Sequence, residues 1–133
     1  MPSSQSPYSA HNFVLYLENS EGDQKPLGGF EEVSDLPSRP PGCHKADLAL
    51  RRGVCNAKNL WDWILGERGR SGARWRDAIL TQGKAAGSSM KSWRLYSATP
   101  TKYNGPTPEG IGGDVALEEL VLSVEYIEVR LRR

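Results

Sequence analysis

Alternating apolar side chains mark the first structured segment of the chain, residues 12–18, which read NFVLYLE. Successive side chains of an extended strand point to opposite faces, so this segment has three apolar side chains on one face and two on the other. We therefore predict a strand that is apolar on both faces. One face is expected to fill the core, and the other to meet a second copy of the chain.

The same pattern predicts five further strands, at residues 30–34, 46–52, 74–82, 90–97 and 114–133. Residues 74–82 and 90–97 are expected to pair as a hairpin. Alternation places its core face at Trp75, Ile79, Trp93 and Leu95. The opposite face then carries Arg74, Arg76 and Arg94 as a candidate interaction patch.

The last strand contains one break in its pattern. Leu120, Val121 and Leu122 are three consecutive apolar residues, which predicts a bulge or burial on both faces.

Turn chemistry separates the predicted strands. Residues 20–29 (SEGDQKPLGG) and 99–113 (TPTKYNGPTPEGIGG) are rich in Gly and Pro, and we expect loops there. Residues 37–45 (PSRPPGCHK) contain three prolines, which excludes them from the centre of a sheet. Residues 1–11 are polar and contain Pro2 and Pro7, so they are predicted to form a flexible N-terminal arm.

One helix is predicted, from Asn56 as the N-cap to a stop at Gly66 or Gly69. Leu60 with Ile64, and Trp61 with Leu65, have the i, i+4 spacing of neighbours on a helix surface. We interpret Trp61 and Trp63 as anchors that hold this helix against a sheet.

These elements predict a mainly β fold: a small antiparallel β-barrel or two-sheet sandwich with one flanking helix. At 133 residues the chain has room for one domain, which we place at residues 12–133. No run approaches the 18 apolar residues of a membrane span, and no membrane insertion by this chain alone is expected.

Charge gives no general attraction to nucleic acid, because 17 basic and 16 acidic residues leave a net charge of +1. One local cluster interleaves Trp75 with arginines, namely Arg68, Arg70, Arg74 and Arg76. Such a pattern can bind single-stranded nucleic acid, so a small nucleic-acid-binding barrel is a distant alternative. If Trp75 lies in the core, its ring cannot stack on a base of the nucleic acid.

Catalytic chemistry is sparse, and we predict no enzyme, no catalytic residue and no cofactor. The two histidines, His11 and His44, fall in the predicted arm and in a proline-rich loop. The carboxylate pairs Glu31–Glu32 and Glu118–Glu119 are adjacent on strands and should point to opposite faces.

A metal site is not predicted either. The two cysteines, Cys43 and Cys55, could supply four zinc ligands together with the two histidines, but no paired spacing pre-forms half a site. Free thiols in a reducing cytosol are the simpler expectation.

Five short motifs follow one another along the chain. The first comprises Gly29, Phe30, Glu32, Val33, Ser34 and Leu36, and the second Leu48, Leu50, Arg52 and Gly53. The third is the helix segment with Leu60, Trp61 and Trp63, and the fourth comprises Trp93, Pro100, Lys102, Gly105 and Pro106. The fifth is the closing strand VALEELVLSVEYI. In order and spacing they resemble the tail tube proteins of contractile phages and of phage-derived contractile injection systems.

The resemblance covers most of the chain and implies a structural role without chemistry. It implies hexameric rings that stack into a hollow tube, with a lumen for DNA or protein cargo, an architecture that the type VI secretion tube protein shares. Implied partners are other copies of the chain, sheath, baseplate or spike, and tape-measure proteins. The implied location is the bacterial cytoplasm during assembly, then a phage tail (virion) or injection particle. The arginine patch would face the lumen or a neighbouring subunit.

One departure from the family leaves two roles open. Between Leu36 and Leu48 the family usually has a longer excursion toward the neighbouring ring, whereas this chain has only PSRPPGCHKAD. The main tube is the primary prediction. A tube-initiating ring on the baseplate, or a terminal ring, is the alternative.

Overall fold

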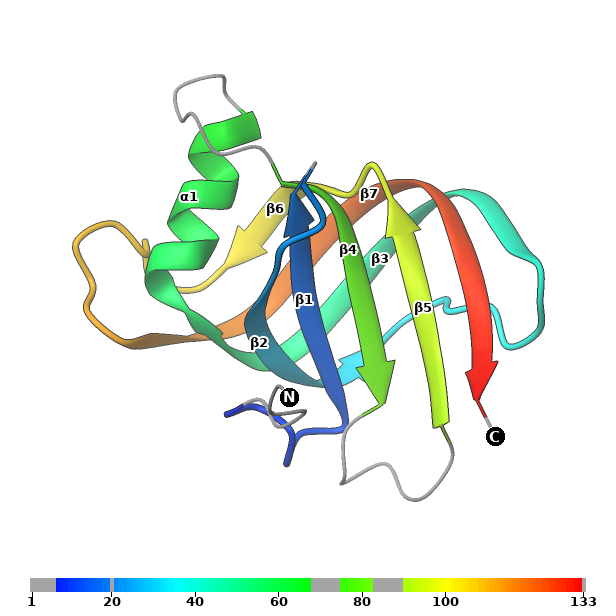
Figure 1. Ribbon diagram of the computed structural model, residues 1–133. Helices are drawn as coiled ribbons and strands as arrows, with labels where there is room; N and C mark the ends of the chain where they lie inside the picture. The colour runs from blue at the N-terminus through cyan, green and yellow to red at the C-terminus, as the bar shows by residue number, and fades with distance from the viewer. Residues whose placement is uncertain (1–6, 20, 68–74, 83–89, 133) are drawn as a thin grey trace.

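The computed structural model describes residues 7–19, 21–67, 75–82 and 90–132 (Figure 1). The elements in chain order are β1 (Phe13–Asn19), β2 (Gln24–Val33), β3 (Gly42–Asn56), α1 (Ala57–Glu67), β4 (Trp75–Gln82), β5 (Met90–Tyr96), β6 (Thr99–Asn104) and β7 (Asp114–Arg132).

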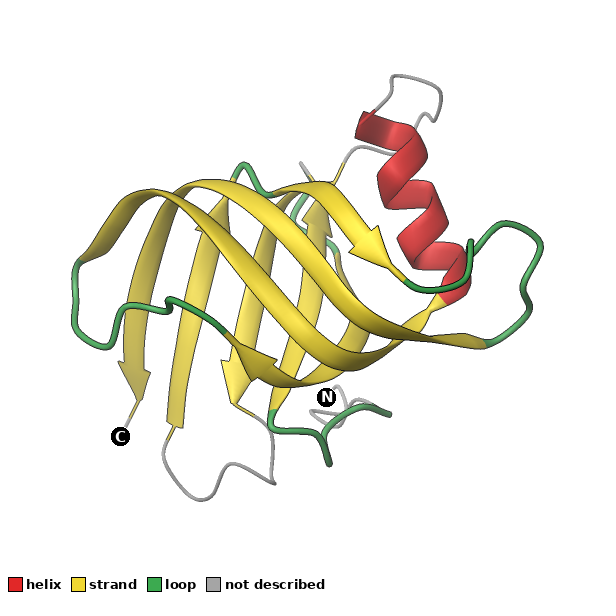
Figure 2. Cartoon of the chain, turned by 180° about the vertical axis from the view of Figure 1, so that it is seen from behind, coloured by secondary structure: helices red, strands yellow, loops and turns green. Residues whose placement is uncertain are grey.

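The strands form a closed antiparallel barrel. They pair in the order β3-β2-β1-β4-β5-β7-β6, and a further pairing of β3 with β7 closes six of them into the barrel. β6 pairs with β7 alongside β5 and lengthens one wall. Figure 2 shows β3 and β7 running side by side across this wall. The predicted mainly β class is confirmed, and the barrel is the alternative that the chain adopts.

Two strands extend beyond their predicted limits because long-range pairing outweighs local turn signals. β2 begins at Gln24, inside the predicted turn 20–29, and pairs with β1 through a register shift next to Tyr16. β3 begins at Gly42, inside the predicted loop 37–45, and pairs with β7 along its whole length. Of that loop, only residues 37–41 lie outside a strand.

The predicted loop 99–113 is also part strand, because Thr99–Asn104 form β6 against β7. A register shift between Pro100 and Lys102 accommodates the proline in this edge strand. A bulge was predicted at Leu120–Leu122 of β7, and the register shift is instead found in the partner strand β6. Leu120 and Leu122 are buried in the core, while Val121 is half-buried on the opposite face.

The core-face assignment of the hairpin is confirmed in β5 and wrong in β4. Trp93 and Leu95 are buried, as predicted. In β4, however, Ala78 and Leu80 face the core and Ile79 is half-buried on the other face. Both faces of β4 are apolar in sequence, so pairing with β1, which sets Leu80 opposite Leu15, decides the register. The side chain of Trp75 lies outside the described residues.

The helix begins as predicted, because Asn56 Oδ1 accepts a hydrogen bond of 2.9 Å from the backbone N–H of Asn59. Its described residues run to Glu67, and it contacts β2, β3 and β6 (Figure 1). Leu60 and Trp63 are buried, whereas Trp61 is only half-buried. Trp63 is thus the anchor of the helix. Within the described residues, no helix combines the length and apolarity that crossing a membrane would require.

Candidate assembly surface

The outer face of the barrel carries a belt of charges on three neighbouring strands. Each strand contributes two consecutive charged residues, which are Glu31 and Glu32 on β2, Arg51 and Arg52 on β3, and Glu118 and Glu119 on β7. All six side chains are exposed or half-exposed. We call this set the charged belt.

Both members of each pair lie outside the core, which corrects the prediction that they point to opposite faces. On β3, Arg52 has a φ of 53°, so the strand changes face there and Gly53 lies on the core side. A side chain on Gly53 would meet the buried Phe30 ring, with its Cβ 2.2 Å from Phe30 Cδ2. The motif residues Phe30, Arg52 and Gly53 therefore act together to build the belt.

Two ion pairs cross the charged belt. Arg52 lies 2.6 Å from the carboxylate of Glu32, and Arg51 Nε lies 3.1 Å from that of Glu119. Exposed pairs of this kind contribute about 0–1 kcal/mol each to stability. Glu118 is exposed and has no ion-pair partner among the described residues. The ion pairs of the charged belt thus contribute little to the stability of the fold.

A second cluster lies on the outer face of β1, β4 and β5, around Arg94. Glu18 and Asp77 face each other across β1 and β4, and Arg94 forms ion pairs with both, at 3.0 Å to Asp77. The three side chains are only 13–21% exposed. Partial burial lowers the pKa of Arg94, but hydrogen bonds to Glu18 and attraction to both carboxylates outweigh it and raise the pKa overall. Arg94 therefore offsets part of the repulsion between two facing carboxylates.

Aromatic side chains extend this cluster to β7 and β3. Arg94 lies 5.3 Å from the centroid of the Tyr96 ring, and Tyr96 donates a 2.9 Å hydrogen bond to Glu128. This hydrogen bond raises the pKa of Tyr96 and lowers that of Glu128, which Arg130 lowers further. Tyr126 lies between Tyr96 and His44, with ring centroids 5.9 and 4.8 Å away.

Of the predicted arginine patch, the structure places only Arg94. It lies outside the core, as alternation predicted, and acidic residues lie beside it. Arg68, Arg70 and Arg74 lie outside the described residues, and so does the side chain of Arg76. Contact of Arg94 with a lumen or a neighbouring subunit stays a prediction.

The shortened segment after Leu36 folds back on the barrel. The buried Trp93 donates a 2.7 Å hydrogen bond to the carbonyl of Pro37, and Tyr126 donates one of 3.2 Å to that of Pro41. Ser34 fixes the start of the segment, because its Oγ accepts a hydrogen bond from the backbone N–H of Ala49. Val33 and Leu36 pack against the core at its edge.

The other motif residues divide between core and surface. Leu48 and Leu50 are fully buried. Pro100 pairs with β7, and Gly105 lies so close to Leu117 that an added Cβ would be 2.7 Å from its Cδ2. Lys102 and Pro106 are exposed, and no ion pair of Lys102 occurs in the described part of the chain.

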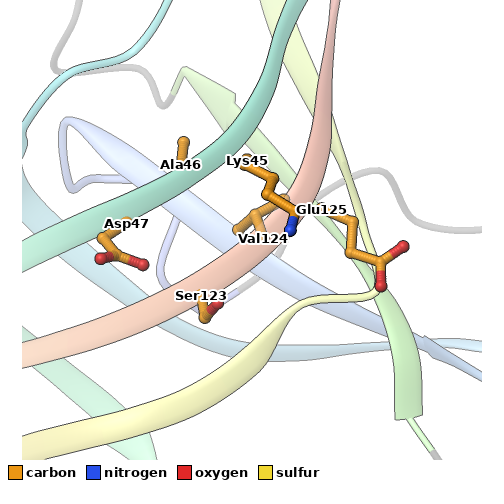
Figure 3. Close-up of a pocket in the computed structure, with 6 residues that line it drawn as sticks. All are labelled: Lys45, Ala46, Asp47, Ser123, Val124 and Glu125. Carbon is orange, nitrogen blue, oxygen red and sulfur yellow. The ribbon is translucent and has the colours of Figure 1, made fainter.

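Two open grooves mark the surface. One, of about 400 Å³, runs along β3 and β7 and is lined by Lys45, Ala46, Asp47, Ser123, Val124 and Glu125 (Figure 3). The other, of about 590 Å³, lies between the start of α1, with Trp61, and the loop Pro108–Gly113. Neither is an enclosed binding pocket.

The described residues contain no group of three or more His, Cys, Asp or Glu side chains that could hold a metal ion. Cys55 lies in the core, where burial raises the pKa of its thiol, and Cys43 is also a free thiol.

Sequence reasoning missed most of the Arg94 cluster. Glu18 and Asp77 meet only through the pairing of β1 with β4, and Tyr96 meets Glu128 through the pairing of β5 with β7. Outward parity was an available signal for Tyr96, which follows the core residue Leu95, but not for Asp77, because the predicted register of β4 placed it on the core face with Ile79.

Comparisons with known proteins give three similar solved structures. A chain of the sheath-tube complex of an extracellular contractile injection system (PVC) in its extended state is 19% identical, with a TM-score of 0.52 over 99% of this chain and 100% of that one. A chain of the PVC sheath/tube terminator is 18% identical, with a TM-score of 0.51 over 96% and 99%. A chain of the anti-feeding prophage (AFP) baseplate is also 18% identical, with a TM-score of 0.52 over 96% and 97%. At these identities they share the fold.

No curated protein sequence matches the chain. The family model described as T4-like virus tail tube protein gp19 matches residues 16–128, which include the charged belt, the Arg94 cluster and all five motifs. The chain therefore belongs to the T4-like virus tail tube protein gp19 family.

Proposed function

We propose that the chain is a structural subunit of the inner tube of a contractile tail or injection system. In this proposal it forms stacked hexameric rings around a lumen for DNA or protein cargo. It has no enzymatic role, and it assembles in the bacterial cytoplasm with sheath, baseplate or spike, and tape-measure proteins. Family membership and the outward charged surfaces support this role.

The observation that carries the proposal is a pair of unpaired strand edges on opposite sides of β7. β2 covers β3 only from Leu50 to Cys55, so residues 42–48 have no strand partner on that side within the described chain. Among the described strands, β6 pairs only with β7. Unpaired edges favour association with another chain, and two different edges favour head-to-tail contacts that can close into a ring.

The size of the chain fits a ring with a lumen. A globular chain of 133 residues has a radius of gyration of about 14 Å and a diameter of about 36 Å. Six equal spheres in a ring leave a hole of about one sphere diameter. Such a hole admits a DNA duplex or a small folded protein.

Native mass spectrometry and electron microscopy of the purified chain test this role. We expect six-subunit species at high concentration, and rings that stack into tubes. A chain that is monomeric in both experiments, and also monomeric or absent in the assembled particle, would reject ring assembly.

A tube-initiating or terminal ring is the second candidate. It is favoured by the segment after Leu36, which is short and is held at both ends by hydrogen bonds from Trp93 and Tyr126. Electron microscopy separates the two roles, because the main tube predicts long tubes and the alternative predicts single rings.

A further inference from the structure

Residues Pro7–Asn12 form a strap on the outside of the barrel. Tyr8 is 4% exposed and donates a 2.8 Å hydrogen bond to Asp114 at the start of β7. At the other end, His11 Nδ1 lies 2.8 Å from Glu31 Oε2, and Asn12 donates hydrogen bonds to the same residue. The described end of the predicted arm is thus held at two points.

The strap has a seat shaped for it on β2. An ideal Cβ on Gly29 would lie 2.4 Å from His11 Cδ2, and its three nearest atoms all belong to His11. Gly29 thus leaves room for the imidazole ring. Beside it, Val14 is 2% exposed yet does not belong to the core cluster. The strap therefore covers apolar surface on the outer face.

The seat belongs to a row of small and apolar residues across the barrel wall. Strand pairing sets Val14 opposite Gly29, Gly29 opposite Val54, and Val54 opposite Ala116. Exposure rises along this row, from the buried Val14 to the exposed Ala116. The row thus continues beyond the residues that the strap covers.

The charged belt flanks this row on the same face. Two positions along each strand, the next row contains Glu31, Arg52 and Glu118, so charge alternates in sign from β2 to β3 to β7. An alternating pattern complements a copy of itself displaced by one strand, whereas a partner of uniform charge would meet repulsion on alternate strands. The surface therefore favours a second copy of the chain.

We propose that the seat and the belt beside it form a self-association surface, and that the strap covers this surface in the free subunit. Release of the strap exposes Val14 and frees Glu31 for contact with the arginines of a second copy. This inference rests on the proposed tube function, because it assumes that the chain associates with itself. In this proposal, two subunits associate through this surface only after the strap has been displaced.

The variant Gly29→Ala tests the proposal, because the added Cβ displaces His11 before any barrel atom. Gly112→Ala is the matched control, since that position has open space and no left-handed φ. Tyr8→Phe removes the hydrogen bond to Asp114 at the other end of the strap. For each variant, hydrogen exchange of residues 8–12 reports strap release, and sedimentation reports the concentration at which rings form.

We expect faster exchange of the strap and ring formation at about tenfold lower concentration in Gly29→Ala and Tyr8→Phe, which is the effect of freeing one valine-sized apolar contact. Gly112→Ala should match the wild type in both measurements. Strap release with unchanged or weaker ring formation would overturn the inference while leaving the tube function intact. Absence of rings in the wild type at every concentration would instead count against the proposed function.

Discussion

The inner and outer faces of the same strands are organised by different interactions. Inside the barrel, apolar side chains such as Leu15, Leu80 and Leu122 are fully buried. Outside, ion pairs, hydrogen bonds and aromatic contacts connect residues from five strands around Arg94. Burial of apolar surface is the larger source of stability, whereas partly exposed charges contribute less to stability and more to specificity. Inner-face substitutions should therefore impair folding, and outer-face substitutions assembly.

The helix gives the sharpest form of this contrast, because its two tryptophans differ in burial. Trp63 is 1% exposed, so Trp63→Ala should lower the free energy of unfolding by about 3–5 kcal/mol. Trp61 is half-buried beside a groove, and Trp61→Ala should cost about 1 kcal/mol or less. Urea denaturation of both variants measures the difference. Equal losses would contradict the assignment of Trp63 as the anchor.

Gly53 tests the point where β3 changes face. Its added Cβ in Gly53→Ala would meet the Phe30 ring, which is fully buried and has little freedom to move. We expect a loss of about 1–3 kcal/mol in the free energy of unfolding, typical of overpacking. Gly112→Ala, in open space, is the control and should change stability by about 0.5 kcal/mol or less. A neutral Gly53→Ala would mean that the ring does not require this glycine.

Arg94 is the outer-face residue with the largest expected effect on stability. Arg94→Ala leaves Glu18 and Asp77 facing each other without a cation, and should cost about 2 kcal/mol at pH 7. Double variants with Glu18→Gln or Asp77→Asn should recover part of this loss, because they remove the repulsion. Chemical denaturation at low and high salt measures both effects. Additive losses in the double variants would refute the coupling.

Lys102 is expected to affect assembly alone. It is exposed on β6 and has no ion-pair partner in the described part of the chain, so Lys102→Ala should leave the free energy of unfolding within about 0.5 kcal/mol of the wild type. We expect the variant to need a higher protein concentration to form rings. Lys91→Ala, a change at a half-buried lysine on β5, is the control. Unchanged ring formation would mean that Lys102 contacts only solvent in the assembled ring.

The smallest effect should come from the Tyr96–Glu128 hydrogen bond. Because this bond lowers the folded-state pKa of Glu128, its stabilisation is present above the ordinary glutamate pKa of about 4.3 and is lost as the pH falls through the lowered value. Tyr96→Phe should therefore reduce the loss of stability between pH 6 and pH 3. Denaturation curves at the two pH values test this. An unchanged pH dependence would exclude a contribution from the pair.

The sequence predicts the inner face better than the outer face. Period-2 alternation identified Trp93 and Leu95 as core residues, and the Asn56 cap located the helix start. Alternation failed at Ile79, where both strand faces are apolar and only pairing with β1 selects one. It could not find the Glu18–Asp77 pair either, because that contact depends on which strands become neighbours.

The same limit applies to the charged belt. Local sequence gives adjacent carboxylates opposite directions, whereas Leu117 and Leu120 are both buried, so strict alternation fails at Glu118 and Glu119 between them. Similarly, the polar composition of residues 1–11 gave no signal of the docked strap, since the seat at Gly29 lies on another strand. The short motifs were enough to indicate the family, because their residues are those that such long-range contacts require.

A cryo-electron microscopy reconstruction of the assembled particle tests most directly whether the outer face is the functional part of this barrel. We predict hexameric rings in which the charged belt or the Arg94 cluster contacts a neighbouring subunit or lines the lumen. In that structure the barrel interior should be unchanged. Rings in which both outer-face regions remain in contact with bulk solvent outside the tube, or particles that contain the chain only as a monomer, would contradict this prediction.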